Sequence, residues 1–379
     1  MKNRIKVTLA VLLIGSNLSA LSQVGDVVIK GTVHKWPTDT IYFYELPFHS
    51  PYSFNARFVK INSDSTFRLK YTDIEKTFVF MIGPQKTPLD LKVQDLLFDN
   101  LTSDHYYGHC IKVYTVGVAT FLVKPKTNLD LDITFNTWIE KLSQKRAETL
   151  KRMGIHVFDD NTVRDYGTTE LIFHGSEQFS YEYYQESFNL DDKLDKLLER
   201  TKEISSAIKK LEKRKTKLLS SLKKEQNNLD AQFYNYIKAE IEFGAKKEFL
   251  KYLQFEHEEY LTNLFNEEIP TEIMKVVEFD KSNIIDEVLI NEEYNEYLEL
   301  YLNFKMNMKQ KKYIVFNEFS KSKYDLAIAE LPNRSKYYYL ANNLLHTKPT
   351  SDFFSLYEDL IQRYPEGELN DKLYDKFEK

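Results

Sequence analysis

The segment from His105 to Cys110 gathers residue types that often bind transition metals. Imidazoles at His105 and His109 and the thiol of Cys110 lie within six residues, and Asp104 could support one imidazole by a hydrogen bond. Gly108 and the strand-like sequence around the segment indicate a loop, in which the two histidines would not share a helix face. A metal site at these three residues is the weaker hypothesis, and we favour a polar loop beside a buried thiol.

Other stretches that resemble catalytic motifs are incomplete. His257 begins a sequence like that of a zinc-protease helix, but Leu261 stands where the second histidine is needed. His174 and Ser176 flank a glycine, yet the second glycine of a nucleophile elbow is missing. The 57 acidic residues leave open a pair of carboxylates working as in glycoside hydrolysis. We assign no catalytic or cofactor-binding residue, expect no cofactor, and favour a protein that is not an enzyme.

The composition excludes several classes of protein. Basic residues number 52 and acidic residues 57 among 379, and the resulting charge of −5 argues against a dedicated nucleic-acid binder. One cysteine excludes a disulfide framework, a cysteine-based zinc finger and a Cys-x-x-Cys redox pair. With 26 Tyr and 26 Phe, the chain has far more packing groups than a disordered protein. The length of 379 residues predicts two folded domains.

Residues 1–22 have the three parts of a secretory signal peptide. The first six residues contain three basic side chains, an apolar run follows at 7–14, and the sequence Ala-Leu-Ser at 20–22 fits a cleavage site. The apolar run is shorter than the ~18 residues or more that a membrane-spanning helix needs. We therefore expect a location in the periplasm or another extracytoplasmic compartment.

Residues 23–178 carry the pattern of short β-strands separated by turns. Leu129, Leu131, Ile133 and Phe135 alternate with polar residues, which predicts a strand with one buried face. Several similar runs in this region predict an antiparallel β-sandwich with solvated outer faces. Residues 138–153 have a helical pattern, which predicts a short helix before the last strand.

Residues 179–379 change to the apolar period of helices, so the predicted fold class is α+β, an antiparallel β-sandwich followed by an all-helical domain. Over residues 190–229, Leu and Ile recur at steps of three and four. We favour a long antiparallel helix hairpin docked on the rest of the protein, with its break at Asn227 and Asn228. The alternative is an oligomerising coiled coil formed by the 190–229 helix.

Charge is unevenly spread over the helical half. Residues 209–224 contain eight basic residues and one acid, a balance of +7, whereas residues 256–299 contain fourteen acids and two lysines, a balance of −12. We favour complementary solvated faces that help the helices to find their neighbours. The alternative is that the basic stretch rests on an anionic membrane surface.

The order of several short stretches carries a family resemblance. They are residues 26–33, 40–44, 63–69, 129–133 and 172–176 in the β-rich part, and 249–261, 324–327 and 337–341 in the helical part. They resemble the region that precedes the thioredoxin domain in periplasmic thioredoxin-family proteins of the TlpA/ResA type. In that family a Trp-Cys-x-x-Cys centre lies in the thioredoxin domain. No catalytic residue carries over to this chain, because Cys110 is its one cysteine.

The resemblance implies a periplasmic location and a binding or positioning role. The chain would be the non-catalytic front of a longer protein or a homologue without the reductase domain. We expect an exported interaction module whose partners are envelope proteins or a separate thioredoxin-like domain, with membrane contact less favoured. The alternative is a periplasmic hydrolase of an envelope polymer, which needs two carboxyl groups ~5–10 Å apart, one with a raised pKa.

Overall fold

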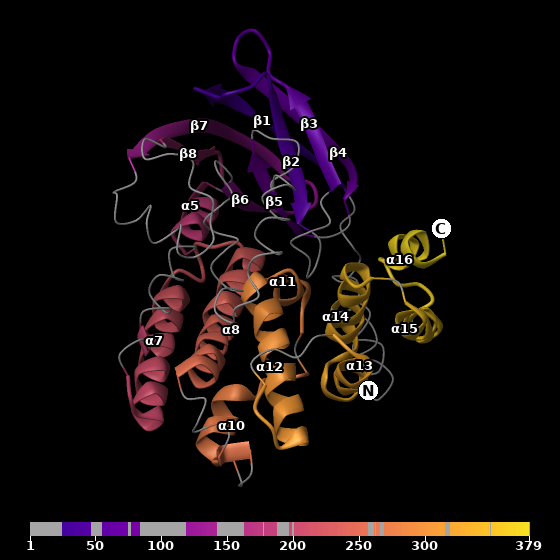
Figure 1. Cartoon of the computed structure of the whole chain (residues 1–379). Helices are drawn as coiled ribbons and strands as arrows, with labels where there is room; N and C mark the ends of the chain where they lie inside the picture. Colours follow the sequence, from indigo (N-terminus) through magenta and orange to yellow (C-terminus); the bar gives the residue numbers. More distant parts are fainter. Residues whose placement is uncertain are drawn as a thin grey trace, which may run out of the picture.

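The computed structural model describes a β-rich region followed by a helical region (Figure 1). The described residues are 25–46, 55–74, 77–83, 119–141, 163–176, 178–187, 197–198, 201–256, 261, 263–265, 269–282, 284–314, 319–348 and 350–378. The predicted signal peptide lies outside these residues. Within them, no helix has the length and apolar character needed to cross a membrane.

The first sheet has the strand order β4-β1-β7-β8. Its strands are β1 (Gly25–His34), β4 (Thr66–Ile74), β7 (Asn128–Lys141) and β8 (Val163–His174). The outer pairs, β1 with β4 and β7 with β8, are antiparallel, but β1 and β7 are parallel. The prediction of an all-antiparallel sandwich is therefore wrong at this pair. The reason is topological, because the chain forms the second sheet between β1 and β7, and so long a connection permits parallel neighbours.

The second sheet is antiparallel throughout and has the order β3-β2-β5-β6. Its strands are β2 (Thr40–Leu46), β3 (Asn55–Lys60), β5 (Phe78–Gly83) and β6 (Ala119–Val123). Rings from the two sheets meet between the layers, with centroids 6.0 Å apart for Phe43 and Phe67 and for Phe121 and Phe173. The two sheets therefore share one hydrophobic core.

Strand β7 confirms one prediction and corrects another. The four alternating apolar side chains between Leu129 and Phe135 are all buried, at most 5% exposed. The strand continues through Trp138 to Lys141 and pairs with β8 from Asp130 to Lys141. The helix expected over 138–153 is therefore wrong at its start, because this ladder satisfies the backbone groups that a helix would have paired internally. Residues 142–153 lie outside the described part.

The helices begin directly after β8. They are α5 (Gln178–Ser187), α7 (Ile204–Lys224), α8 (Ala231–Glu256), α10 (Thr271–Val277), α11 (Asp286–Leu289), α12 (Glu292–Gln310), α13 (Lys321–Glu330), α14 (Asn333–His346), α15 (Ser351–Arg363) and α16 (Asn370–Phe377). Helices α7 and α8 are consecutive and pack against each other, as expected for the hairpin. The continuous helix predicted over 190–229 is wrong at 201–203, which are not helical, and α7 begins at Ile204. The break falls at 225–230, where the Asp230 carboxylate accepts a hydrogen bond from the Gln232 amide at 2.9 Å and caps the new helix.

Aromatic side chains of α5 and α8 complete the core of the sheets. Tyr181 stacks on Phe173 of β8 with 4.4 Å between ring centroids, and Phe233 meets Tyr181 edge-on at 4.7 Å. At the start of α8, the Asp230 carboxylate also forms an ion pair with Lys124, which follows β6. We predicted a domain boundary between residues 178 and 179, and α5 begins at Gln178. The core nevertheless continues across this point.

Candidate functional site

The candidate metal ligands His105, His109 and Cys110 lie outside the described residues. Among the residues that the structure does describe, no three His, Cys, Asp or Glu side chains are grouped as a metal site would require. Three other features of the described part could carry function. They are a polar group on the first sheet, a buried charge cluster between α8 and α12, and an aromatic surface on α15 and α16.

The polar group on the first sheet joins three neighbouring strands. In the parallel register Thr32 of β1 lies beside Asp132 of β7, and its hydroxyl donates a hydrogen bond to Asp132 Oδ1. His174, at the end of β8, places Nε2 2.9 Å from Asp132 Oδ2. His34 Nε2 lies 3.3 Å from the Thr32 hydroxyl oxygen. Alternation along β1 and β7 puts these side chains on the outer face, opposite the buried Leu131.

The proton positions in this group do not favour nucleophilic catalysis. A Thr nucleophile must give its proton to a sufficiently strong base, whereas the Thr32 hydroxyl donates to the Asp132 carboxylate, whose lowered pKa makes it a weak proton acceptor. His34 is then left to donate to the Thr32 oxygen rather than to accept from it. The hydrogen bond from Thr32 and that with His174 lower the pKa of Asp132. The carboxylate therefore serves as a shared acceptor that links three strands.

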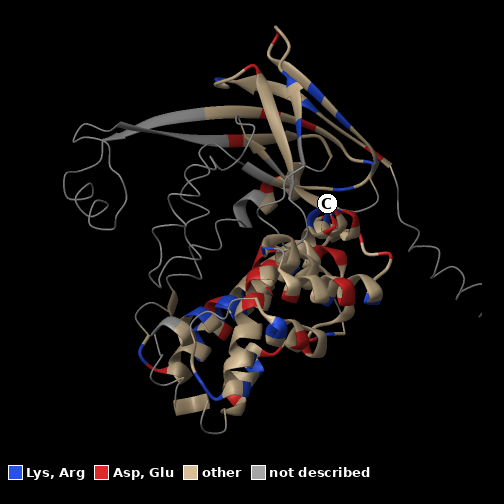
Figure 2. Cartoon of the chain, turned by 45° about the vertical axis from the view of Figure 1, so that its right-hand side comes forward, with Lys and Arg blue, Asp and Glu red and all other residues tan. Residues whose placement is uncertain are grey.

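Carboxylates on the same sheet bear on the hydrolase alternative. Asp130 pairs with Lys30 at 3.0 Å, and Asp26 pairs with Lys70 at 2.6 Å, each with about half of its side chain exposed. A general acid needs a raised pKa, whereas that of Asp132 is lowered. These carboxylates form charge pairs across strands, which is the usual arrangement on a solvated sheet. Figure 2 shows both basic and acidic residues along the strands. They give the hydrolase alternative no support.

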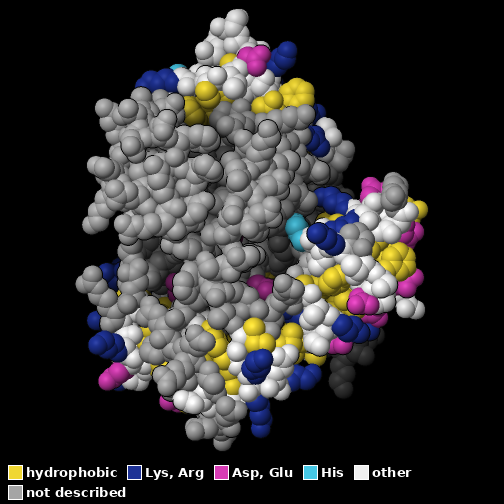
Figure 3. Space-filling model, in the orientation of Figure 1, with side chains coloured by type: hydrophobic (Ala, Val, Ile, Leu, Met, Phe, Trp, Pro, Cys, Tyr) yellow, Lys and Arg dark blue, Asp and Glu magenta, His cyan; other side chains and the backbone are white. Residues whose placement is uncertain are grey.

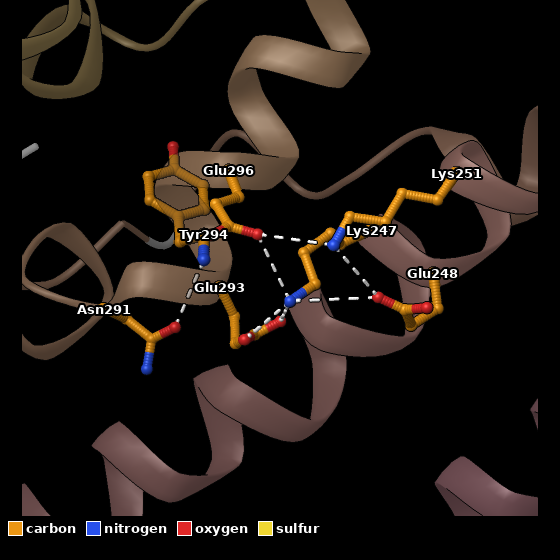
Figure 4. A network of polar contacts seen from close by, with 7 residues as sticks. All are labelled: Lys247, Glu248, Lys251, Asn291, Glu293, Tyr294 and Glu296. Carbon is orange, nitrogen blue, oxygen red and sulfur yellow. Dashed lines mark hydrogen bonds and ion pairs between the residues drawn. The ribbon is translucent and has the colours of Figure 1, made fainter. Parts of the chain in front are cut away.

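The buried charge cluster joins α8 to α12 (Figure 4). Lys247 has 5% of its side chain exposed, and its Nζ lies 2.6 and 2.8 Å from the two carboxylate oxygens of Glu293. Glu296 on α12 and Glu248 on α8 follow at 3.3 and 3.8 Å. Lys251, one turn further along α8, lies within 3.6 Å of both these carboxylates. Three carboxylates therefore surround two ammonium groups at the centre of the helical region.

The carboxylates around Lys247 indicate that the cluster has a structural role. Burial alone would lower the pKa of Lys247, but Glu293, Glu296 and Glu248 outweigh that effect and hold its pKa above the ordinary value. A lysine that stays protonated cannot act as a nucleophile or a general base. The sequence did not reveal the cluster, because Lys and Glu at helical spacing usually lie on exposed faces. The one available signal is the run Lys246-Lys247-Glu248 in a part of α8 that also contains Phe243, Phe249 and Leu250.

Aromatic rings gather on the last two helices. Phe354 of α15 is 37% exposed and Tyr374 of α16 is 48% exposed, and they are two of the five large hydrophobic side chains that stand out from the described surface. Phe377 packs against Phe354 at 6.5 Å and stacks on Tyr357 at 5.0 Å. The Tyr357 hydroxyl donates to Glu378 at 2.6 Å, which fastens the end of α16 to α15. We call Phe354, Tyr374 and Phe377 the aromatic surface.

Comparisons with known proteins give no family to which this site can be assigned. No family model, no curated protein and no solved structure matches the chain. The resemblance to the region before a thioredoxin domain therefore stays a hypothesis. The aromatic surface and the charged faces are the described features that bear on function.

Proposed function

We propose that this protein is an exported, non-catalytic interaction module that holds a partner protein on the aromatic surface of α15 and α16. The partner would be an envelope protein or a separate thioredoxin-like domain, as the resemblance of the chain suggests. The signal-like sequence of residues 1–22 supports export. The observation that carries the proposal is the exposure of Phe354 and Tyr374 on a firmly packed pair of helices.

The exposed rings of the aromatic surface are well suited to binding a partner protein. Aromatic side chains are enriched in protein interfaces, because each buries a large area at a small cost in conformational entropy. Stacking of Phe377 on Tyr357 holds the backbone beneath the aromatic surface, so docking would not have to order these helices. Leu356 and Leu360 anchor the opposite side of α15 in the helical core. The exposed rings are therefore available without unfolding.

The experiment is affinity capture with the full chain from the envelope of the source cells, followed by direct binding of the purified candidate partner. The double variant Phe354→Ala/Tyr374→Ala should weaken binding at least ~10-fold, as expected when two interface rings are removed. The matched control, Phe58→Ala/Ile172→Ala, removes two exposed apolar side chains from the sheets and should bind as the unmodified protein does. Equal binding by both variants, or recovery of no partner, would refute the proposal.

A second assay addresses the non-catalytic part of the proposal. Dithiol exchange needs two neighbouring sulfur atoms, and this chain contains one cysteine, Cys110. The purified protein should therefore not reduce the disulfides of insulin. Insulin reduction that persists in a Cys110→Ala variant would contradict this expectation.

A further inference from the structure

The outward side of α7 carries a continuous row of lysines. Six lysine side chains on this helix are exposed, whereas the buried positions of α7 are Ala207, Leu211 and Leu222. Dark blue side chains project at the lower left of the space-filling view, the edge at which α7 lies (Figure 3). We call these six residues the basic stripe: Lys209, Lys210, Lys213, Lys217, Lys223 and Lys224.

Helical geometry places the stripe on one face. At about 100° per residue the six lysines fall within an arc of roughly 140°, centred opposite Leu211 and Leu222. From Lys209 to Lys224 the stripe extends for ~22 Å at 1.5 Å per residue. The helix has the amphipathic form of a surface helix, with its apolar side buried in the protein and its charged side left open.

The acidic stretch of the helical half does not neutralise the stripe. Its ion pairs among the described residues are made with cations elsewhere, as for Glu293 with Lys247, Glu278 with Lys305 and Glu299 with Lys323. On α7 itself Glu212 pairs with Lys215, which lies off the stripe. The complementary faces that we favoured from the sequence are not among these pairs. The charge of α7 is therefore directed to solvent.

We propose that the basic stripe docks the protein on the surface of an anionic phospholipid bilayer. Lysine is a compact point charge that adds to a diffuse attraction, whereas recognition of individual carboxylates or phosphates favours the paired hydrogen bonds of arginine. Single-stranded nucleic acid would require aromatic rings for base stacking, and α7 contains none. The six lysines lie on one side of α7, so this helix can rest lengthwise on a flat charged surface. This proposal is independent of the proposed function.

The strength of such docking follows from the number of lysines. Each lysine near an anionic leaflet strengthens partitioning by about fivefold, and the attraction acts within a Debye length of ~8 Å at physiological salt. Removing four of the six charges should therefore weaken binding strongly. Because the apolar side of α7 stays buried in the protein, binding should be purely electrostatic and should vanish as the salt concentration rises.

The experiment measures binding of the full chain to large vesicles of phosphatidylcholine with about one third phosphatidylglycerol, and to vesicles of phosphatidylcholine alone. The test variant replaces Lys209, Lys213, Lys217 and Lys224 by glutamine, which has a similar helix propensity. The matched control replaces four exposed lysines elsewhere by glutamine: Lys60, Lys275, Lys312 and Lys348. Both variants have the same net charge and the same N-terminal segment, and circular dichroism verifies that both are folded.

The expected result is binding to anionic vesicles that is lost at high salt, absent on neutral vesicles, and weakened at least ~10-fold by the stripe substitutions. The control variant should stay within about threefold of the unmodified protein. A smaller loss in the stripe variant, or an equal loss in the control, would overturn the proposal. Tighter binding to an acidic polypeptide or an oligonucleotide than to anionic vesicles would also overturn it, because the stripe would then serve another class of partner.

Discussion

Replacing Lys247 by methionine should reveal how strongly the buried charge cluster holds α8 against α12. Methionine keeps most of the aliphatic volume but leaves Glu293, which is bonded through both oxygens at 2.6 and 2.8 Å, without its main cation. Glu296 and Glu248 would lose the same partner. Removing one member of a buried ion pair costs ~3–5 kcal/mol, because the remaining charge stays desolvated. That loss is a large part of a typical unfolding free energy of ~5–15 kcal/mol.

Urea denaturation followed by helical circular dichroism measures this loss as a shift of the midpoint at unchanged slope. Lys238→Met is the matched control, because Lys238 lies on the same helix but is 46% exposed and pairs with Glu242 at 3.9 Å. Such an exposed pair contributes ~1 kcal/mol or less. The double variant Lys247→Met/Glu293→Met should recover part of the stability, since it removes the uncompensated charge as well. Equal destabilisation by Lys247→Met and Lys238→Met would refute the argument from burial.

Three further predictions concern the backbone and pH. Gly31→Ala should destabilise the protein by at least ~2 kcal/mol in urea denaturation, because the added Cβ would overlap the carbonyl oxygen of Leu131 across the parallel ladder. A denaturation midpoint equal to that of the unmodified protein would contradict this steric argument. Burial raises the pKa of Tyr337 and Tyr338 to about 12, so the folded state keeps protons that the unfolded state releases near pH ~10. Stability should therefore fall as the pH rises from about 10 to 12, and urea denaturation of Tyr337→Phe/Tyr338→Phe should show a smaller fall. An equal fall in this variant would be inconsistent with the burial of the two hydroxyl groups. Burial lowers the pKa of Lys246 to about 8, so the unfolded state binds more protons between pH about 8 and 10.5. This residue should therefore make the stability of the folded state increase with pH in that window. Thermal denaturation of Lys246→Met should lack that increase, and a pH profile of stability equal to that of the unmodified protein would contradict the prediction.

Residue pattern predicts local structure in this chain well where one periodicity dominates. The alternation from Leu129 to Phe135 gave the buried face of β7, and the change of period after residue 178 gave the helices. The break of the α7–α8 hairpin was placed within a few residues of Asp230. In each case one strong local preference determines the local structure, and the packing of the fold agrees with it.

The remaining features depend on relations between distant residues. The sequences of β1 and β7 do not reveal that the two strands are parallel, because apolar and polar residues alternate in the same way in parallel and antiparallel pairs. Trp138 continues β7 although its sequence suits a helix, since pairing with Tyr166 of β8 decides the outcome. Two of the three partners of Lys247, Glu293 and Glu296, lie on a helix about fifty residues further on. Only the three-dimensional structure brings such groups together.

The parallel pair of β1 and β7 also bears on how the chain reaches its native state. Val28 is bonded beside Asn128, so the first strand has no neighbour on that side until a further hundred residues have been synthesised. Contacts between such distant segments slow folding, because a long loop must close before they stabilise anything. Even then the sheet core is incomplete until Tyr181 and Phe233 arrive. The ribosome must therefore synthesise the chain through Phe233 before the first strand is enclosed, and fragments that stop earlier would expose an unpaired, aggregation-prone strand edge.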